Sequence, residues 1–394
     1  MTIQPKYQID TKENKQFLEN ARKELLSFGH HFPSPEGSSY YLGDDGTPWK
    51  DRNRETWITS RMAHVYSLGF FLGHDGSKEL AAAAIHGLRT ELHDKKNGGW
   101  YAGLTADGEI VPTKQCYAHA FVILAASSGV LAGIEGAKEL LDEALALYDL
   151  RFWNESEGLS CDTWNTEFTK LDDYRGLNAN MHTVEAFLAA ADVTGLEAYR
   201  IRAGRIIDHV LTWAQNNQWR IPEHFHKDWT PDLECNKNHP DDPFKPYGAT
   251  PGHGIEWTRL ITQWTLSTYK DSTAAGAAPY ISEQRRYISE PLPMPGTSMA
   301  HRDWYIRPTG MARLSFMTEC TGRWRKQSIP LPFSGISPER NATQRTMFPL
   351  CSIWMKSYGI IIPAPGFISL IRIISFSVQY GPENPIFTMQ SRQR

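Results

Sequence analysis

The sequence of 394 residues lacks the features that mark membrane, secreted and nucleic-acid-binding proteins. It has no run of 18 apolar residues, so no membrane-spanning helix is expected. Its five cysteines are irregularly spaced and form no Cys-x-x-Cys pair, which argues against a disulfide framework or a zinc site and predicts free thiols. A net charge of −3 gives no basic footprint for nucleic acid. The polar start, MTIQPKYQIDTKENKQ, contains no signal peptide and predicts a cytoplasmic protein.

The composition changes abruptly near residue 275. From Ala275 onward the chain carries 14 Lys and Arg, 12 of them Arg, against 6 Asp and Glu, and it holds 13 of the 24 prolines. The residues before Ala275 include 27 basic and 38 acidic side chains. We therefore expect two regions: a folded catalytic domain over 1–274 and an atypical, poorly structured basic tail over 275–394.

Residues 1–274 repeat a pair of helices followed by a long loop. Four segments are apolar on nearly all faces, as is typical of helices buried on most sides: 57–73, 116–133, 181–195 and 254–267. Amphipathic segments lie between them: 77–93, 137–153 and 197–215. The loops between pairs contain Gly and Asp-Gly with short β-prone runs, which predicts long loops or small hairpins. Inner helix, outer helix and loop, at a period of roughly 55 to 70 residues, favour an all-α toroid over an open stack of helical repeats.

Polar side chains cluster at the amino-terminal ends of the apolar helices, which would converge on one mouth in a toroid. They are Arg61 and His64, Tyr117 and His119, Asn178 and His182, and His253 and Glu256. Glu185 and Glu256 each follow a histidine at the third position, which places each His/Glu pair on one helix face.

Three kinds of chemistry fit this set. Glu and His on facing helices can bind a metal ion, but no third ligand group is obvious in the sequence. Glycoside hydrolysis needs two carboxylates facing across a bond, whereas histidines dominate the predicted mouth. Metal-free acid–base catalysis is favoured, because a histidine moves protons, a glutamate stabilises its charged form, and Arg61 can hold a developing oxyanion. Trp57, Trp100 and Tyr117 would then offer flat faces to a sugar.

Four motifs in this order resemble the N-acylglucosamine 2-epimerase superfamily, and within it the aldose–ketose isomerases that act on mannose or sulfoquinovose. They are WITSRMAHVYSLG (57–69), KKNGGWYAG (95–103), YRGLNANMHTVEAF (174–187) and TPGHGIEWTRL (250–260). The resemblance covers roughly residues 25–269. It implies an (α/α)6 barrel, a monosaccharide substrate, no cofactor and no metal. The implied reaction interconverts an aldose and a ketose through an enediol or enediolate.

The resemblance also implies roles for individual residues. Arg61 matches the arginine that binds substrate oxygens beside the reacting carbons, and Trp57, one turn earlier, lines the same pocket. Asn178 and His182 match an Asn-x-x-x-His segment of the site.

The stretch around His253 supplies the expected catalytic unit. His253 is expected to shuttle a proton between adjacent sugar carbons or oxygens. Glu256 is expected to orient the His253 imidazole and to stabilise its charged form. Glu185 is expected to be structural. We thus predict His253, Glu256, Arg61 and His182 as catalytic residues and Trp57, Asn178 and Tyr117 as substrate-binding residues.

The family's second histidine, from a carboxy-terminal Asp-x-Tyr-His segment, has no counterpart here. Three explanations of residues 275–394 stay open. The segment is a genuinely different basic tail, a lineage-specific domain, or the product of a shifted reading frame. When the tail is reverse-translated and its bases are regrouped one position earlier, GPENPIFTMQS (381–391) can become WAGKSDIYHAI, with the first base of each new codon adjustable. That string contains Asp-x-Tyr-His and is not present in this chain. A shift between about Asp271 and Tyr280 would leave the toroid incomplete, with low stability and low or absent isomerase activity.

Two other functions stay open. A 2-epimerase acting on N-acylglucosamine or a free sugar would share the proton-abstraction site, and a non-catalytic sugar-binding protein would bind without proton exchange. Lys245 is the one cation near the His253 loop, which favours mannose or lyxose over a sulfosugar. No feature of the sequence indicates an oligomeric state.

Overall fold

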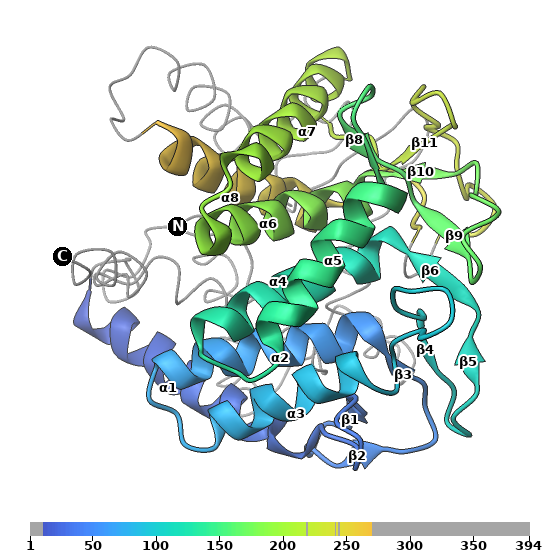
Figure 1. Cartoon of the computed structure of the whole chain (residues 1–394). Helices are drawn as coiled ribbons and strands as arrows, with labels where there is room; N and C mark the ends of the chain where they lie inside the picture. Colours follow the sequence, from blue (N-terminus) through green and yellow to red (C-terminus); the bar gives the residue numbers. More distant parts are fainter. Residues whose placement is uncertain (1–10, 218–219, 241, 243–244, 270–394) are drawn as a thin grey trace, which may run out of the picture.

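A computed structural model describes residues 11–217, 220–240, 242 and 245–269. The predicted tail over 275–394 lies outside these described residues. Within them the chain is mainly helical (Figure 1). The helices are α1 (Lys12–Phe28), the short 3-10 helix η2 (Gly29–His31), α2 (Thr56–Phe71), α3 (Ser77–Arg89), α4 (Cys116–Leu131), α5 (Ala137–Arg151), α6 (Leu177–Thr194), α7 (Glu197–Asn216) and α8 (Pro251–Thr268).

The helices form two layers. Successive inner helices pack side by side, α2 on α4, α4 on α6 and α6 on α8. Each of the first three inner helices also packs against the helix that follows it, α3, α5 or α7, which lies outside it (Figure 1). This is the arrangement of an all-α toroid, and it confirms the predicted fold class.

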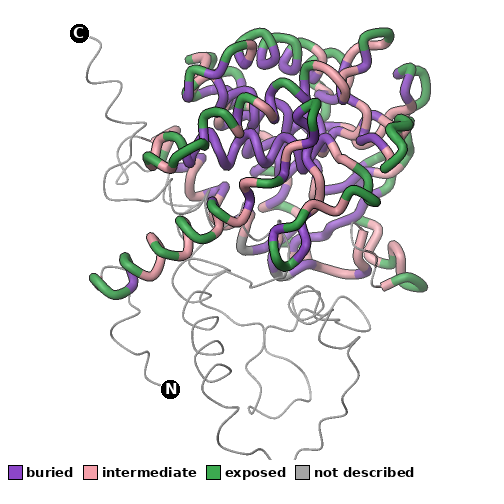
Figure 2. The backbone as a smooth tube through the Cα atoms, turned by 90° about the horizontal axis from the view of Figure 1, so that it is seen from below, coloured by how far each residue is buried: buried purple, intermediate pink, exposed green. Residues whose placement is uncertain are grey.

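Burial explains why the two layers differ in composition. In α2 every residue from Thr56 to Gly69 is buried, and in α4 every residue from Cys116 to Gly129 except Tyr117. Figure 2 shows these inner helices as a continuous buried core. The outer helix α3 buries one stripe, with Ala81, Ala84, Ile85 and Leu88 at helical spacing. Each fully buried leucine or isoleucine contributes about 1.5–3 kcal/mol to folding, so the apolar runs hold the inner ring together.

Glycines allow the two layers to approach closely. Gly76 and Gly136 have φ angles of 74° and 76°, a left-handed conformation that favours glycine, and each directly precedes an outer helix. On the inner helix α4, a Cβ added at Gly129 would lie only 2.9 Å from the Cβ of Ala137. The sequence therefore builds the same turn twice and brings α4 and α5 into close contact.

The loops contain short antiparallel strands, as predicted. Several strands run directly into inner helices, β3 into α2, β6 into α4 and β10 into α6, so these loops lie at the amino-terminal ends of the inner ring (Figure 1). The pairs are β1–β2, β3–β4–β5, β6–β9, β7–β8 and β10–β11. The strands are β1 (Tyr41–Leu42), β2 (Pro48–Trp49), β3 (Arg54–Glu55), β4 (Gly103–Leu104), β5 (Ile110–Val111), β6 (Thr113–Gln115), β7 (Trp153–Asn154), β8 (Leu159–Ser160), β9 (Thr163–Asn165), β10 (Arg175–Gly176) and β11 (His224–Phe225).

The structure adds one helix and extends two others, α6 and α8, at their amino-terminal ends. The polar segment Lys12–Phe28 forms α1, capped by the Thr11 side chain, which accepts from the backbone N–H of Asn14 at 3.3 Å. Helix α6 begins at Leu177, four residues before the predicted start. No helix among the described residues is long and apolar enough to cross a membrane. The cysteines in this part of the chain, Cys116, Cys161 and Cys235, are unbridged.

Candidate active site

Arg61 and Tyr117 bring the first two inner helices together at the predicted mouth. Arg61 is only 3% exposed, and its Nη2 atom donates a hydrogen bond to the Tyr117 hydroxyl at 3.2 Å. Its guanidinium lies 5.0 Å from the ring centroid of Trp57 and 4.3 Å from that of Phe121, within cation–π range. Its Nε atom is buried and bonds to no atom of the described chain. One donor of this buried cation is thus unsatisfied by the described chain.

His182 continues this cluster from α4 to α6. Its ring packs edge-on against Tyr117, with centroids 5.1 Å apart, and lies 4.4 Å from the ring of Phe121. Its Nδ1 atom lies 3.1 Å from Oε2 of Glu185, one turn later on the same helix. Burial lowers the pKa of His182 despite this carboxylate, and Arg61 lowers it further. A neutral His182 therefore donates its Nδ1 hydrogen to Glu185.

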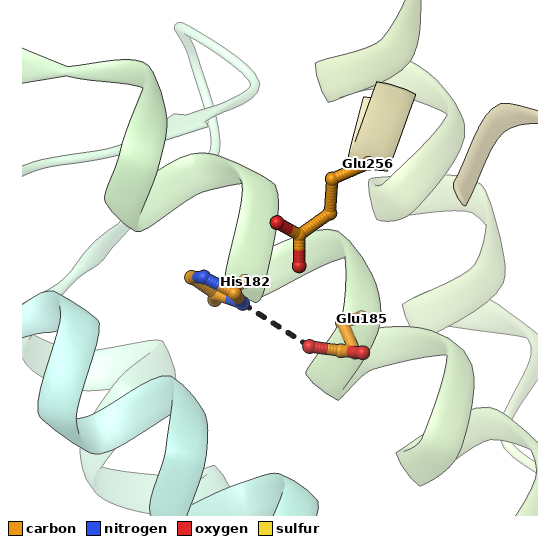
Figure 3. A group of neighbouring side chains, drawn as sticks. All are labelled: His182, Glu185 and Glu256. Atoms are coloured by element: carbon orange, nitrogen blue, oxygen red, sulfur yellow. Dashed lines mark hydrogen bonds and ion pairs between the residues drawn. The ribbon is translucent and has the colours of Figure 1, made fainter. Parts of the chain in front are cut away.

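Glu185 and Glu256 form the acidic side of the cluster, where α6 meets α8. Figure 3 shows the Glu256 side chain extending from α8 toward His182 and Glu185. Glu185 pairs with Arg259, whose Nη2 lies 2.6 Å from its Oε1 and 3.9 Å from Oε1 of Glu256. Burial opposes ionisation of Glu185, but Arg259 and His182 hold its pKa well below the usual range.

His253 has a carboxylate partner, Glu223, that the sequence does not predict. Its Nδ1 atom lies 2.9 Å from Oε2 of Glu223, which belongs to the loop before β11. Glu223 also accepts the backbone N–H of Thr250 at 3.1 Å through Oε1. Burial opposes ionisation of Glu223, yet the interaction with His253 lowers its pKa. Glu223, from a loop 30 residues earlier in the chain, is thus a carboxylate partner of His253 that the sequence analysis did not predict. Glu256, the predicted partner, extends toward His182 and Glu185.

Histidine and two carboxylates could in principle hold a metal ion. Ligand atoms of His182, Glu185 and Glu256 all lie within 4.8 Å of one another. The guanidinium of Arg259, however, already neutralises Glu185 and approaches Glu256. A divalent cation at this position would have to displace or tolerate that positive charge, so the donor set fits a metal poorly.

Two histidines of the predicted mouth are satisfied within the fold. His119 accepts the backbone N–H of Trp100 at Nε2, 3.1 Å away, and donates from Nδ1 to the carbonyl of Gln115 at 2.7 Å. Nδ1 of His64 lies 2.6 Å from the Ser128 hydroxyl. Burial lowers the pKa of His119 to about 3 and that of His64 to about 4. Both are core histidines that stay neutral.

The other predicted residues divide between the cluster and its surroundings. Trp57 packs against Tyr117, with ring centroids 5.9 Å apart, and Asn178 lies half-buried one turn before His182 on α6. Trp100 is fully buried and donates from its indole to a backbone carbonyl, so it presents no face to a sugar. Lys245 places its ammonium 3.7 Å from the ring centroid of Tyr174.

Together these residues offer a cation for a substrate oxygen, aromatic rings and imidazoles backed by carboxylates. Such a set suits proton transfer next to a carbonyl group. Comparison with known protein families agrees with this chemistry. The model of the N-acylglucosamine 2-epimerase family matches residues 37–287. The chain belongs to the N-acylglucosamine 2-epimerase family.

Similar proteins include two that are named D-mannose isomerase. The chain is 39% identical to D-mannose isomerase of Thermobifida fusca over 250 residues, which cover 63% of this chain and 61% of the relative. It is 37% identical to the D-mannose isomerase of Pseudomonas cannabina pv. alisalensis over 247 residues, covering 62% and 59%. The match thus spans about three fifths of these curated relatives.

Solved structures agree with the toroid. A crystal structure of D-mannose isomerase superposes with a TM-score of 0.63 at 27% identity, covering 70% of each chain. A sugar epimerase from a ruminal bacterium, 14% identical, superposes with a TM-score of 0.66 over 93% of this chain and all of that one, which supports the fold alone.

Two members of the cluster in this epimerase-family protein were not predicted from the sequence. Glu223 precedes His253 by 30 residues and lies next to β11, in a loop whose contacts with Thr250 and Pro246 hold it beside the start of α8. Arg259 stands at i+3 from Glu256, a spacing that could have indicated an ion pair on one helix face.

Proposed function

We propose that this chain is built as a cofactor-independent aldose–ketose isomerase for mannose or lyxose, giving fructose or xylulose. The observation that carries the proposal is Arg61, a buried cation whose Nε donor is unused among the described residues and which touches the rings beside His182. The relatives named D-mannose isomerase support the choice of reaction and sugar.

In the proposed reaction, the lone pair of His253 removes the proton from C2 of the open-chain aldose. The C2–H electrons form the C1=C2 double bond, and the carbonyl electrons move to O1, where Arg61 stabilises the negative charge. The O2 proton passes to O1, and the new negative charge on O2 closes to a carbonyl as C1 takes the proton from His253. Atoms and charges balance, and no metal or cofactor takes part.

The transfer from O2 to O1 needs a second acid–base group across the sugar. The resemblance assigns this role to a histidine in Asp-x-Tyr-His, which the sequence lacks. We therefore propose that the chain as written has low or no turnover. Turnover of mannose at the rate of the complete relatives, by a chain of confirmed mass, would contradict this part of the proposal.

Incubation of the full chain with mannose in D2O tests the function. Slow entry of deuterium at C1 or C2, with fructose as product and loss of both in a His253→Ala variant, is the expected result. Glucose as the product would indicate a 2-epimerase instead. Binding of mannose or fructose without any deuterium entry would indicate a non-catalytic sugar-binding protein.

The atypical tail is proposed to arise from a shifted reading frame. Sequencing the gene across codons 265 to 285 is the direct test, and an unbroken frame there would refute it. The frame-corrected chain would regain Asp-x-Tyr-His and should turn over mannose much faster.

The remaining proposals concern location and substrate. We propose a cytoplasmic protein, because its described cysteines, Cys116, Cys161 and Cys235, are unbridged. A sulfosugar is disfavoured because Lys245 already lies over the Tyr174 ring. Faster deuterium entry into sulfoquinovose than into mannose would reverse this preference.

A further inference from the structure

Glu223 contacts His253 in a way that restricts both partners. It is 6% exposed and uses one carboxylate oxygen for the Thr250 N–H and the other for Nδ1 of His253. The Thr250 bond fixes the carboxylate against the residue that caps α8. Glu223 is therefore attached to the start of the helix that carries His253 as well as to His253 itself.

The backbone around Glu223 is fixed from several directions. Its carbonyl accepts the N–H of Leu177, the first residue of α6, at 3.0 Å. The next residue, His224, pairs with Gly176 in the β10–β11 ladder. The His224 ring donates from Nε2 to the carbonyl of Pro246 at 2.8 Å and accepts from the Tyr174 hydroxyl at Nδ1, 2.7 Å away. These contacts join the loop to α6 and to the segment before α8.

The carboxylate also determines which nitrogen of His253 carries the hydrogen. An ionised carboxylate can only accept hydrogen bonds, so Nδ1 of a neutral His253 is the protonated nitrogen. The lone pair is then on Nε2, on the other side of the ring. Both oxygens of Glu223 act as acceptors, which glutamine cannot reproduce because one of its two terminal atoms is a donor.

We propose that Glu223 is the positioning residue for His253: it holds the imidazole in the Nδ1–H tautomer, so that the Nε2 lone pair is the base that takes the sugar proton. This inference rests on the proposed isomerase function for its catalytic part. Its structural part, the control of the tautomer, stands independently of turnover.

The test uses the full chain labelled with 15N-histidine and two-bond 1H–15N correlation spectra, with His253→Asn to identify the His253 signals. In the unmodified chain, His253 should show the Nδ1–H pattern. In Glu223→Gln, an amide that keeps its oxygen on Thr250 turns its NH2 toward Nδ1, so the Nε2–H form should appear. The His253 pKa should also fall by at least about one unit, because the neighbouring negative charge is lost.

Two further variants distinguish a specific effect of Glu223 on His253 from a general loss of structure. Glu223→Asp keeps the charge and should restore most of the Nδ1–H form. Glu91→Gln makes the same chemical change at a carboxylate that binds Ser34, the Ser38 N–H and Arg54 away from the site. It should leave the His253 spectrum unchanged. His224 and Tyr174 from the strand side interact electrostatically with Glu223, and Glu256 follows His253 by three residues on α8. All three stay unaltered in these variants.

Deuterium entry into mannose gives the functional readout. Glu223→Gln should slow it at least about tenfold and move its pH dependence to lower pH together with the His253 pKa, with partial recovery in Glu223→Asp. Unchanged tautomer, pKa and exchange in Glu223→Gln would overturn the inference while leaving the isomerase proposal intact. Tautomer control by Glu223 without deuterium entry in this chain or in the frame-corrected one would support the positioning and refute the isomerase function.

Discussion

Nη2 of Arg259 lies 2.6 Å from Oε1 of Glu185, and this ion pair joins α8 to α6 within the candidate site. Both side chains are largely buried, at 13% and 10% exposure. Because a buried charge without its partner is costly, Arg259→Met should lower the free energy of unfolding by about 3 kcal/mol. Urea unfolding of the full chain, followed by circular dichroism, measures this loss.

A double-variant cycle isolates the pair from its surroundings. Glu185→Gln combined with Arg259→Met should cost clearly less than the sum of the two single changes. Strictly additive losses would show that the two side chains stabilise the fold separately.

Arg61 gives a prediction for sugar binding. Arg61→Lys keeps the charge but loses the planar donor set that reaches the Tyr117 hydroxyl. The dissociation constant for fructose should rise about tenfold, the equivalent of one hydrogen bond to a charged group, as measured by calorimetry. Arg205→Lys makes the same change on the outer helix α7 and should leave binding unaltered. An equal change of the dissociation constant in both variants would contradict the placement of Arg61 in the sugar site.

The acidic cluster gives a prediction for metals. Treatment with a chelator should leave deuterium entry into mannose unchanged. Zn²⁺ should not raise the melting temperature of the unmodified chain, because Arg259 neutralises the carboxylate ligands. In Arg259→Met, Zn²⁺ should raise it, since His182, Glu185 and Glu256 are then available. Activity that chelation abolishes and Zn²⁺ restores would contradict a metal-free site.

The core histidines predict a loss of stability in acid. Burial lowers the folded-state pKa of His119 to about 3, whereas an unfolded histidine titrates near about 6.5. Between these values the unfolded chain binds more protons, so stability falls as the pH is lowered from about 6.5, by up to about 1.4 kcal/mol per pH unit. Urea unfolding at several pH values should show a smaller slope in His119→Gln. An unchanged slope would show that His119 does not contribute.

The sequence predicted the inner ring well because burial on all sides leaves a strong signal. Helices α2 and α4 are continuous apolar runs with scattered small residues. Such runs require burial on nearly all faces, and an inner helix ring provides it. Helix α1 was missed because its sequence, KENKQFLENARKELLSF, is mostly polar and buries only Asn14 and Leu26. Its helical state depends on a cap and on tertiary contacts such as the Tyr66 hydroxyl donating to the Leu26 carbonyl at 2.8 Å.

The site was predicted only in part, for a related reason. Arg61, Tyr117 and His182 were predicted because they interrupt apolar helices that must be buried, and the structure brings the three side chains into contact. Spacing along one helix predicted that Glu256 orients His253 and stabilises its charged form. The group at Nδ1 of His253 is Glu223, 30 residues earlier in the chain. Contacts between distant segments produce that pairing, and the local periodicity of one helix carries no information about it.

Strand β6 leads into α4 and is hydrogen-bonded to β9, which precedes α6, with Thr113 opposite Asn165 and Gln115 opposite Thr163. Two neighbouring repeats thus share one small sheet at the end of the toroid where the proposed sugar site lies. A change of length in either loop would be transmitted to the other. Altering substrate preference by exchanging loops with a relative would therefore require both segments to be transplanted as a unit.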